Sequence, residues 1–181
     1  MTSTRSGESA LERIGELFDT HHQRLYRLAR RLSGSAEEAR DLVQETYLRA
    51  AAKAAALPAG GAGEEAWLVR VLVNLSRDQR RRRRVRQREG ARLAVMPRHA
   101  PSHEAAALAK QSIQAALAAL PARRRAFVVL HALEGLTVRE VASLLGVAQV
   151  TVRWHLARAY RQMASRLEPA ERAAAAEEKK I

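Results

Sequence analysis

The chain has 181 residues and a formal net charge of +13. Such a charge points to a polyanionic partner, with nucleic acid favoured over an anionic membrane surface. No apolar run approaches the ~20 residues that span a bilayer, the N-terminus lacks a signal-peptide core, and the absence of Cys excludes disulfides and thiolate zinc sites. We therefore expect a cytoplasmic protein without membrane insertion.

Ala, Leu and Arg dominate the composition, and because all three are strong helix formers we predict an all-α fold. Two small helical domains are expected over residues 9–88 and 107–167. Between them, residues 89–106 contain Gly90, Pro97 and Pro101 and lack a sustained apolar period, which is typical of a flexible linker.

The first domain is predicted to begin with a long helix. Ser9 and Glu12 have the spacing of a capping box at its start, which leaves residues 1–8 as a frayed end. Apolar residues then mark one face of the helix, and Ser33 and Gly34 end it. These apolar residues are Leu11, Ile14, Leu17, Phe18, Leu25, Leu28 and Leu32.

A second helix is expected over residues 36–56, with Ser35 and Glu38 as its capping box. Its apolar side should be buried. That side consists of Ala39, Leu42, Val43, Thr46, Tyr47 and Ala50. The outer side is partly acidic and contains Asp41, Gln44, Glu45 and Arg49. It is either a solvated helix surface or a docking surface for a basic protein.

A third helix should follow the loop of residues 58–63 and begin at Glu64 and Glu65, near its positive dipole end. Its apolar stripe is Trp67, Leu68, Val71, Leu72 and Leu75, and the polar residues lie mostly off that stripe. These are Arg70, Asn74, Arg77, Asp78 and Arg80, and the arginine run continues with Arg81 to Arg84. The run is a solvated tail or a phosphate contact, and its place directly after a patterned helix favours phosphate.

Residues 137–161 have the pattern of a helix-turn-helix. Thr137 and Glu140 form a capping box for the first helix, and Gly146 ends it in the left-handed region. In the second helix, Val150, Val152, Leu156 and Ala159 should face inward. Its other face is basic and polar, with Gln149, Thr151, Arg153, Trp154, His155, Arg158 and Arg161, and Arg139 lies on the helix before it. Such side chains suit a helix in the major groove; a helical hairpin with a solvated basic face is the alternative.

Two further apolar faces precede this motif in the second domain. One holds Ile113, Leu117 and Leu120, and the other holds Phe127, Val128, Leu130 and Leu133.

Three segments, taken together and in order, resemble an extracytoplasmic-function sigma factor of bacterial RNA polymerase. They are AEEARDLVQETYLRA (36–50), WLVRVLVNLSRDQRRR (67–82) and LPARRRAFVVLHALEGLTVREVASLLGVAQVTVRWHLARAYRQM (120–163). The resemblance covers residues 11–88 and 108–165 and implies a region-two domain followed by a region-four domain.

The resemblance also implies roles for residues. Asp41, Leu42, Gln44, Glu45 and Arg49 match the surface that docks on the beta-prime clamp helices of the core enzyme. Residues 67–81, with Trp67, Arg70, Asn74, Arg77, Arg80 and Arg81, match the part that opens and recognises the downstream promoter element, and the loop 58–65 matches one that holds a flipped base. The basic and polar face of the second helix of the helix-turn-helix, together with Arg139, matches the part of the family that recognises the upstream promoter element. Ala148 stands where the family often has a capping Ser.

Core RNA polymerase, including its beta flap, promoter DNA and an anti-sigma factor are the partners that the resemblance implies. Two other classes stay open: a stand-alone helix-turn-helix regulator with residues 9–88 as a sensor or dimerisation domain, and an enzyme acting on nucleic acid. No phosphate-cradling Gly-rich loop, HExxH or catalytic triad stands out. We therefore predict no catalytic residues, no cofactor and no metal site.

Overall fold

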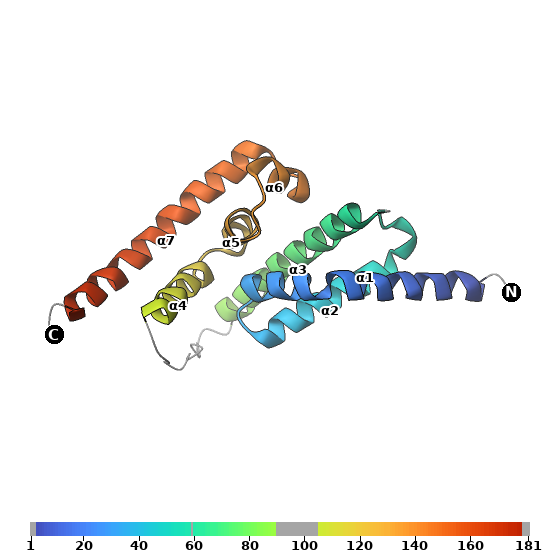
Figure 1. Cartoon of the computed structure of the whole chain (residues 1–181), viewed down its shortest axis with the longest axis horizontal. Coiled ribbons are helices and arrows are strands. Elements are labelled where there is room, and N and C mark those ends of the chain that lie inside the picture. The colour runs from blue at the N-terminus through green and yellow to red at the C-terminus, as the bar shows by residue number, and fades with distance from the viewer. Residues whose placement is uncertain (1–2, 59, 90–104, 179–181) are drawn as a thin grey trace. The chain divides into compact units, whose positions relative to one another are not determined.

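The computed structural model describes residues 3–58, 60–89 and 105–178, with side chains described within 12–54, 56–58, 60–83 and 111–167. Every regular element in these ranges is helical, which confirms the all-α prediction (Figure 1). No helix among the described residues is long and apolar enough to cross a membrane.

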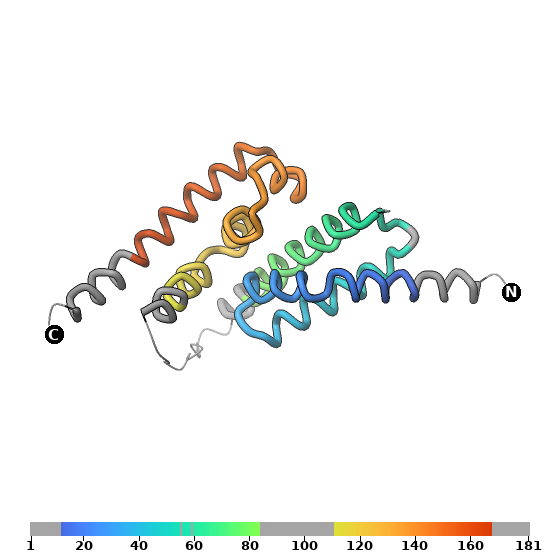
Figure 2. The backbone as a smooth tube through the Cα atoms, in the orientation of Figure 1, coloured from blue at the N-terminus to red at the C-terminus, as the bar shows by residue number. Residues whose placement is uncertain are grey.

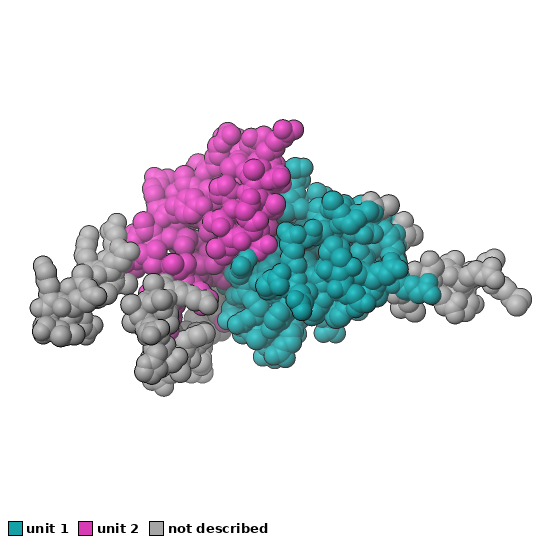
Figure 3. Space-filling model, viewed as in Figure 1, with its two compact units in different colours: residues 1–82, 142–146 teal, residues 83–141, 147–181 magenta. Residues whose placement is uncertain are grey.

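Two compact units make up the chain: residues 1–82 with 142–146, and residues 83–141 with 147–181 (Figure 3). The predicted linker at 89–106 lies almost wholly outside the described residues. The domain boundaries at 9–88 and 107–167 therefore stay predictions.

The first unit starts with a pair of packed helices, α1 (Ser3–Leu32) and α2 (Ala36–Ala52). Helix α1 begins at Ser3. The prediction that Ser9 starts it and that the preceding residues are frayed is therefore wrong. The helix continues through Gly7 because a single glycine lowers helix stability by only about 1 kcal/mol. Leu17, Leu25, Leu28 and Leu32 are buried as expected, whereas Phe18 is 44% exposed. Its ring lies 4.3 Å from that of His22 and 5.2 Å from that of Tyr47.

Helix α2 begins as the sequence predicts. The Ser35 hydroxyl accepts the Glu38 N–H at 3.1 Å, and the Glu38 carboxylate accepts the Gly34 N–H at 2.8 Å. All six residues of its predicted apolar side are buried. Tyr47 donates its hydroxyl to the Leu17 carbonyl at 3.3 Å, and burial raises the pKa of Tyr47 to about 12.

Helix α3 (Gly61–Glu89) follows a 3₁₀ turn, η1 (Ala54–Ala56). It starts at Gly61 rather than Glu64, because Gly60 adopts a φ of +91° and its carbonyl accepts the N–H groups of Gly63 and Glu64. The predicted loop is thus partly the first turn of a helix. In Figure 2 the tube of helix α3 runs from that first turn toward the arginine run at the other end of the helix.

The buried side of α3 is wider than the predicted stripe. Val69 is 6% and Val73 is 0% exposed, although neither was predicted to face inward, whereas Trp67 and Val71 are half-buried. Leu68, Leu72 and Leu75 are buried as predicted. The buried residues of α3 therefore extend beyond the single predicted stripe.

The second unit contains α4 (Ala105–Ala118), α5 (Ala122–Val128), a π-helical turn η2 (Val129–Leu133) and α7 (Gln149–Glu178). Helices α4 and α5 both pack on α7. Three residues predicted to be inward are exposed instead: Ile113 by 50%, Leu133 by 45% and Val150 by 69%. Each lies at one end of its apolar pattern. The apolar spacing extends to that position, but no other helix of the described residues covers it.

An unpredicted buried arginine closes the end of α4. Arg125 is 1% exposed, and its Nε donates to the Leu117 carbonyl at 2.8 Å while its Nη2 donates to the Ala118 carbonyl. The last carbonyls of a helix lack intrahelical partners. The guanidinium therefore supplies a partner to the Ala118 carbonyl and a second donor to the Leu117 carbonyl, which also accepts the Leu120 N–H at 3.2 Å.

Helix α6 (Val138–Leu145) begins with the predicted capping box. Thr137 donates its N–H to the Glu140 carboxylate at 2.7 Å and its hydroxyl to the same oxygen at 2.8 Å, while the Glu140 N–H donates to Thr137 Oγ1 at 3.2 Å. Gly146 has a φ of +65°, as the left-handed end of the helix requires. The helix-turn-helix geometry is therefore set by local hydrogen bonds.

The capping box makes the stability of the chain depend on acid pH. The backbone and side-chain hydrogen bonds from Thr137 lower the pKa of Glu140 below its ordinary value of 4.5. The stabilisation is therefore present above that value and is lost as the pH falls through the lower, folded-state pKa. In Glu140→Gln, we expect a smaller drop of the thermal midpoint between about pH 6 and pH 3 than in the wild type. Circular dichroism measures both midpoints, with Glu16→Gln, an exposed site on α1, as control; equal drops in all three proteins would contradict the prediction.

Candidate nucleic-acid interface

The outer face of α2 is exposed and partly acidic. Asp41, Gln44 and Glu45 are exposed, and the Arg49 Nε donates to the Glu45 carboxylate at 3.1 Å. Leu42 was expected in the docking set, but it is 3% exposed and belongs to the helix core, because its position places it on the side that faces α1. The sequence interpretation also missed Leu48, which is 57% exposed. Its spacing of seven from Asp41 and four from Gln44 was the available signal.

Helix α3 presents an exposed amide beside a guanidinium. Asn74 is exposed, and Arg77 Nη1 donates to its Oδ1 at 3.3 Å. This contact confirms that the two side chains share a face, and it leaves the Asn74 Nδ2 donors directed away from Arg77. Among the other predicted contacts, Arg70 and Arg81 are exposed, while Trp67 and Arg80 are half-buried.

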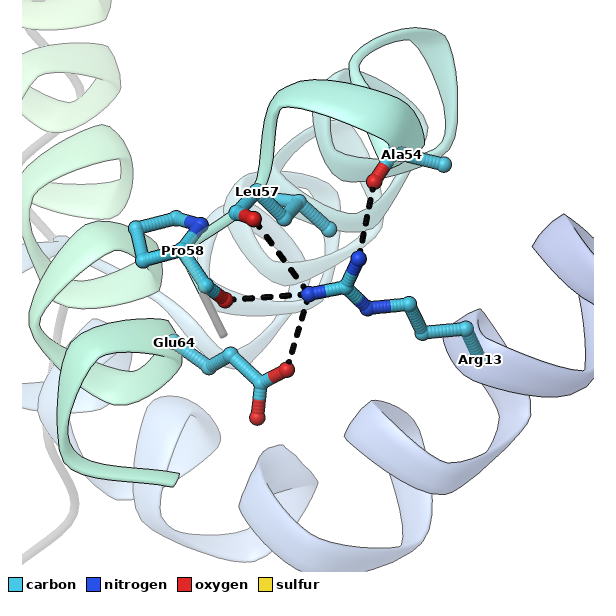
Figure 4. Close-up of polar contacts among 5 residues, drawn as sticks. All are labelled: Arg13, Ala54, Leu57, Pro58 and Glu64. Atoms are coloured by element: carbon cyan, nitrogen blue, oxygen red, sulfur yellow. Dashed lines mark hydrogen bonds and ion pairs between the residues drawn. The ribbon is translucent and has the colours of Figure 1, made fainter. Parts of the chain in front are cut away.

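A single guanidinium from α1 holds the connection between α2 and α3. Arg13 Nη1 donates to the Ala54 carbonyl at 3.1 Å, and its Nη2 lies 2.9 Å from the Pro58 carbonyl, 3.4 Å from the Leu57 carbonyl and 3.0 Å from Glu64 Oε1 (Figure 4). Carbonyls at the end of one helix and a carboxylate at the start of the next thus converge on one cation. We call this set the Arg13 latch.

A second ion pair supports the same region. Arg24, two to three turns further along α1, pairs with Glu65. Glu64 and Glu65 were predicted to be favourable near the helix N-terminus, and in the structure both also anchor α3 to α1. The sequence alone carried no signal for the partner arginines, since they lie 51 and 41 positions away.

The helix-turn-helix face of α7 separates into exposed and packed residues. Gln149, Arg153, Trp154, Arg158 and Arg161 are exposed, as is Arg139 on α6, and Thr151 is half-buried. His155 is also half-buried, and its ring stacks on Phe127 with centroids 4.9 Å apart. His155 therefore helps to pack α7 on α5.

Two contacts order the exposed side chains of α7. Arg153 Nη2 lies 3.5 Å from Gln149 Oε1, and the Arg158 guanidinium lies over the Trp154 ring, 5.6 Å from its centroid.

Ala148 precedes helix α7, and its carbonyl accepts the Thr151 N–H at 3.0 Å. Its methyl side chain supplies no capping acceptor.

The Arg13 latch predicts a loss of stability on its removal. In Arg13→Ala the free energy of unfolding should fall by about 1–3 kcal/mol, because a partly buried carboxylate and several carbonyls lose a charged donor. In Arg13→Lys the free energy of unfolding should fall less, because the positive charge remains although an ammonium cannot form the same hydrogen bonds as the planar guanidinium. Urea unfolding followed by circular dichroism measures the effect. The control is Arg27→Ala, an exposed arginine on the same helix; an equal loss there would show that the latch contributes nothing specific.

Similarity to known proteins covers two successive parts of the chain. Residues 17–86 match the Sigma-70 region 2 family and residues 110–163 match Sigma-70, region 4. The chain is 37% identical over 161 residues to the ECF RNA polymerase sigma factor SigE of Mycolicibacterium smegmatis, a match that covers 86% of this chain but only 62% of SigE. It is 34% identical over 165 residues to the ECF RNA polymerase sigma factor SigL of Mycobacterium tuberculosis, covering 90% of this chain and 92% of SigL.

Solved structures agree with this similarity. The sigma factor RpoE from Bartonella quintana, crystallised with the anti-sigma factor NepR, has a TM-score of 0.62 and 26% identity, covering 85% of this chain and 96% of RpoE. CnrH, in complex with the cytosolic domain of CnrY, has a TM-score of 0.61 at 22% identity and shows the fold alone. From the ordered region matches and the identity to SigL over nearly its full length, the chain belongs to the extracytoplasmic-function family of RNA polymerase sigma factors.

Proposed function

We propose that this chain is a dissociable promoter-specificity subunit of bacterial RNA polymerase. It binds the core enzyme, recognises two promoter elements and helps to nucleate strand opening, and it supplies no catalytic group. The observation that carries this function is the ordered match to sigma regions 2 and 4, combined with an acidic α2 face and an exposed basic α7 face. In this role it works in the cytoplasm with the polymerase.

Core binding is assigned to the outer face of α2. Asp41, Gln44 and Glu45 are exposed on one side of the helix, and they offer carboxylates and an amide to the beta-prime clamp helices. The exposed Leu48 adds an apolar contact in the same row. Mixed acidic and apolar faces suit a partner helix pair, because charge sets the orientation and apolar area adds affinity. The second unit is expected to contact the beta flap.

Downstream-element recognition is assigned to α3. Asn74 supplies donors and an acceptor for a base edge, while the exposed arginines Arg70 and Arg81, with Arg77 and Arg80, supply charge for phosphates. Trp67 is half-buried beside this face. The Arg13 latch binds Pro58 and Glu64, which lie in the loop 58–65 expected to hold a flipped base, whose extrusion costs a few kcal/mol.

Upstream-element recognition is assigned to α7 and its flank. Gln149, Thr151 and Arg153 occupy the first turn and a half of the helix, which is the part of a recognition helix that contacts base edges. Trp154, Arg158, Arg161 and Arg139 add exposed surface around them. His155 acts through packing on Phe127.

An anti-sigma factor is a further expected partner. RpoE, a structural relative, was crystallised with the anti-sigma factor NepR. Such a partner would keep this chain away from the core enzyme until it is released.

A stand-alone helix-turn-helix regulator is the second possible function, and the region 2 match over residues 17–86 disfavours it. The decisive experiment mixes the purified chain with core RNA polymerase and promoter DNA. A sigma factor makes the core start transcripts at a defined position, whereas a repressor binds the DNA and leaves the core inactive.

Core docking predicts a sharp effect of charge reversal. The double variant Asp41→Arg, Glu45→Arg should bind core polymerase at least roughly tenfold more weakly, because an acidic face becomes basic opposite a basic partner. Both side chains are exposed, so circular dichroism should show an unchanged helical fold. Fluorescence anisotropy with labelled core enzyme measures the affinity.

The matched control for core docking is Glu12→Arg with Glu16→Arg. These glutamates are exposed and four residues apart on α1, so the control has the same charge change on another surface of the same unit. If both double variants lose affinity equally, the effect is one of net charge and the docking assignment is wrong.

Strand opening predicts different roles for Asn74 and the arginines. Asn74→Ala should leave closed-complex affinity nearly unchanged and slow promoter opening, since its base becomes available only after unpairing. Arg81→Ala with Arg82→Ala should instead weaken binding to all sequences and reduce the salt slope by about one unit for each arginine. Filter binding across a salt series and a fluorescent-base reporter of strand separation measure these effects. Normal opening by Asn74→Ala with unchanged sequence preference would reduce α3 to a basic arm.

A further inference from the structure

An open hollow on the surface of the second unit, here called the cavity, lies further along α7 than the residues assigned to base recognition. Its volume is about 420 Å³, and it is lined by Arg124 of α5 and by Arg158, Arg161 and Gln162 of α7. Helices α5 and α7 pack together, so the cavity is formed by two elements of one unit. Three of its four lining side chains are cations.

Each of these cations is oriented by an uncharged partner. Arg124 Nη1 donates to Gln162 Oε1 at 2.9 Å, and Gln162 Nε2 in turn lies 3.5 Å from the Ala119 carbonyl. Arg158 lies over the Trp154 ring, and Arg161 Nε lies 3.4 Å from the Ala157 carbonyl. These contacts restrain the guanidiniums, and none of these partners carries a negative charge.

No carboxylate among the described side chains pairs with the cavity. Within residues 111–167 there are eight arginines and two glutamates, Glu134 and Glu140. Glu140 is engaged by Thr137 in the capping box, and neither glutamate lines the cavity. Three like charges around one concave space repel one another, and an anion placed between them relieves that repulsion.

The position of the cavity along α7 identifies the anion. The helix rises about 1.5 Å per residue, so Arg158 and Arg161 lie roughly 8 Å and 12 Å beyond Arg153 along its axis. The major groove is about 12 Å wide, with phosphates along both edges. With the start of α7 in the groove, side chains at this distance lie at the level of the flanking backbone.

We propose that this cavity holds one DNA backbone phosphate at the edge of the upstream promoter element. Arg124, Arg158 and Arg161 donate to its oxygens, and Gln162 is a positioning residue that orients Arg124. The proposal rests on the proposed function. It adds Arg124 to the DNA contacts and makes Arg158 and Arg161 phosphate contacts, while base discrimination stays with Gln149, Thr151 and Arg153.

The first test measures DNA binding by the full chain bound to core polymerase. Arg124→Ala should weaken cognate and scrambled upstream elements by the same factor, about tenfold, and reduce the salt slope by about one. Arg153→Ala should weaken the cognate element more than the scrambled one. The control is Arg123→Ala, which removes an exposed neighbouring arginine outside the cavity and should change neither quantity.

The second test locates the phosphate. Single phosphates on both strands of the upstream element are replaced by neutral methylphosphonates, and the affinity of each duplex is measured for the wild type and for Arg124→Ala. At one position the replacement should weaken the wild type and have little further effect on Arg124→Ala. Arg161→Ala should show the same coupling at the same position, which supplies a second variant in case Arg124→Ala folds poorly.

Three outcomes separate the possibilities. If no position couples to Arg124 or Arg161, the cavity does not hold a backbone phosphate and the proposal is wrong. If Arg124→Ala binds DNA normally but loses affinity for a polyglutamate probe, the cavity serves an acidic protein segment, which also overturns it. If the wild type with core polymerase fails to distinguish a promoter from scrambled DNA, the proposed function itself fails.

Discussion

Arginine side chains in both units donate to backbone carbonyls at helix ends and in a connection between helices. Arg13 donates to the carbonyls of Ala54 and Pro58, and Arg125 donates to those of Leu117 and Ala118. The last carbonyls of a helix have no intrahelical partner and are costly to bury unpaired. A guanidinium can satisfy several of them at once because it carries five donors in a rigid fork.

These anchors matter because the chain has few large side chains with which to pack connections. Only 4% of its residues are aromatic, and leucine and alanine make up most of the core. Charged side chains that reach backbone groups hold the α2–α3 connection, from which α3 starts, and the end of α4.

The surfaces differ in charge in a way that suits separate partners. The α2 face exposes Asp41 and Glu45, which are proposed to contact a protein, whereas α7 exposes arginines that are proposed to contact DNA. In that proposed role each small unit contacts only a few bases. Joining two units in one chain makes the second contact effectively intramolecular, which raises the overall affinity without new contacts.

The sequence by itself determined the features that depend on local spacing. The capping boxes at Ser35 and Thr137, the left-handed Gly146 and the buried side of α2 follow from hydrogen bonds within one turn and from helical periodicity. The family resemblance rested on the same local segments. Three helix boundaries of the first unit were placed wrongly: the start of α1, the end of α2, which is Ala52 rather than residue 56, and the start of α3. Glycine and alanine fit several backbone conformations, so these short stretches carry little information about where a helix begins or ends.

Tertiary structure alone decided which exposed-looking residues are packed and which distant residues meet. His155 lies on the face predicted to bind DNA, but its ring stacks on Phe127 and is half-buried. Arg13 and Glu64 are 51 positions apart, and Arg124 and Gln162 are 38 apart. Periodicity reports which face of a helix a residue occupies. It cannot report which element lies opposite that face, because that depends on how the whole chain folds.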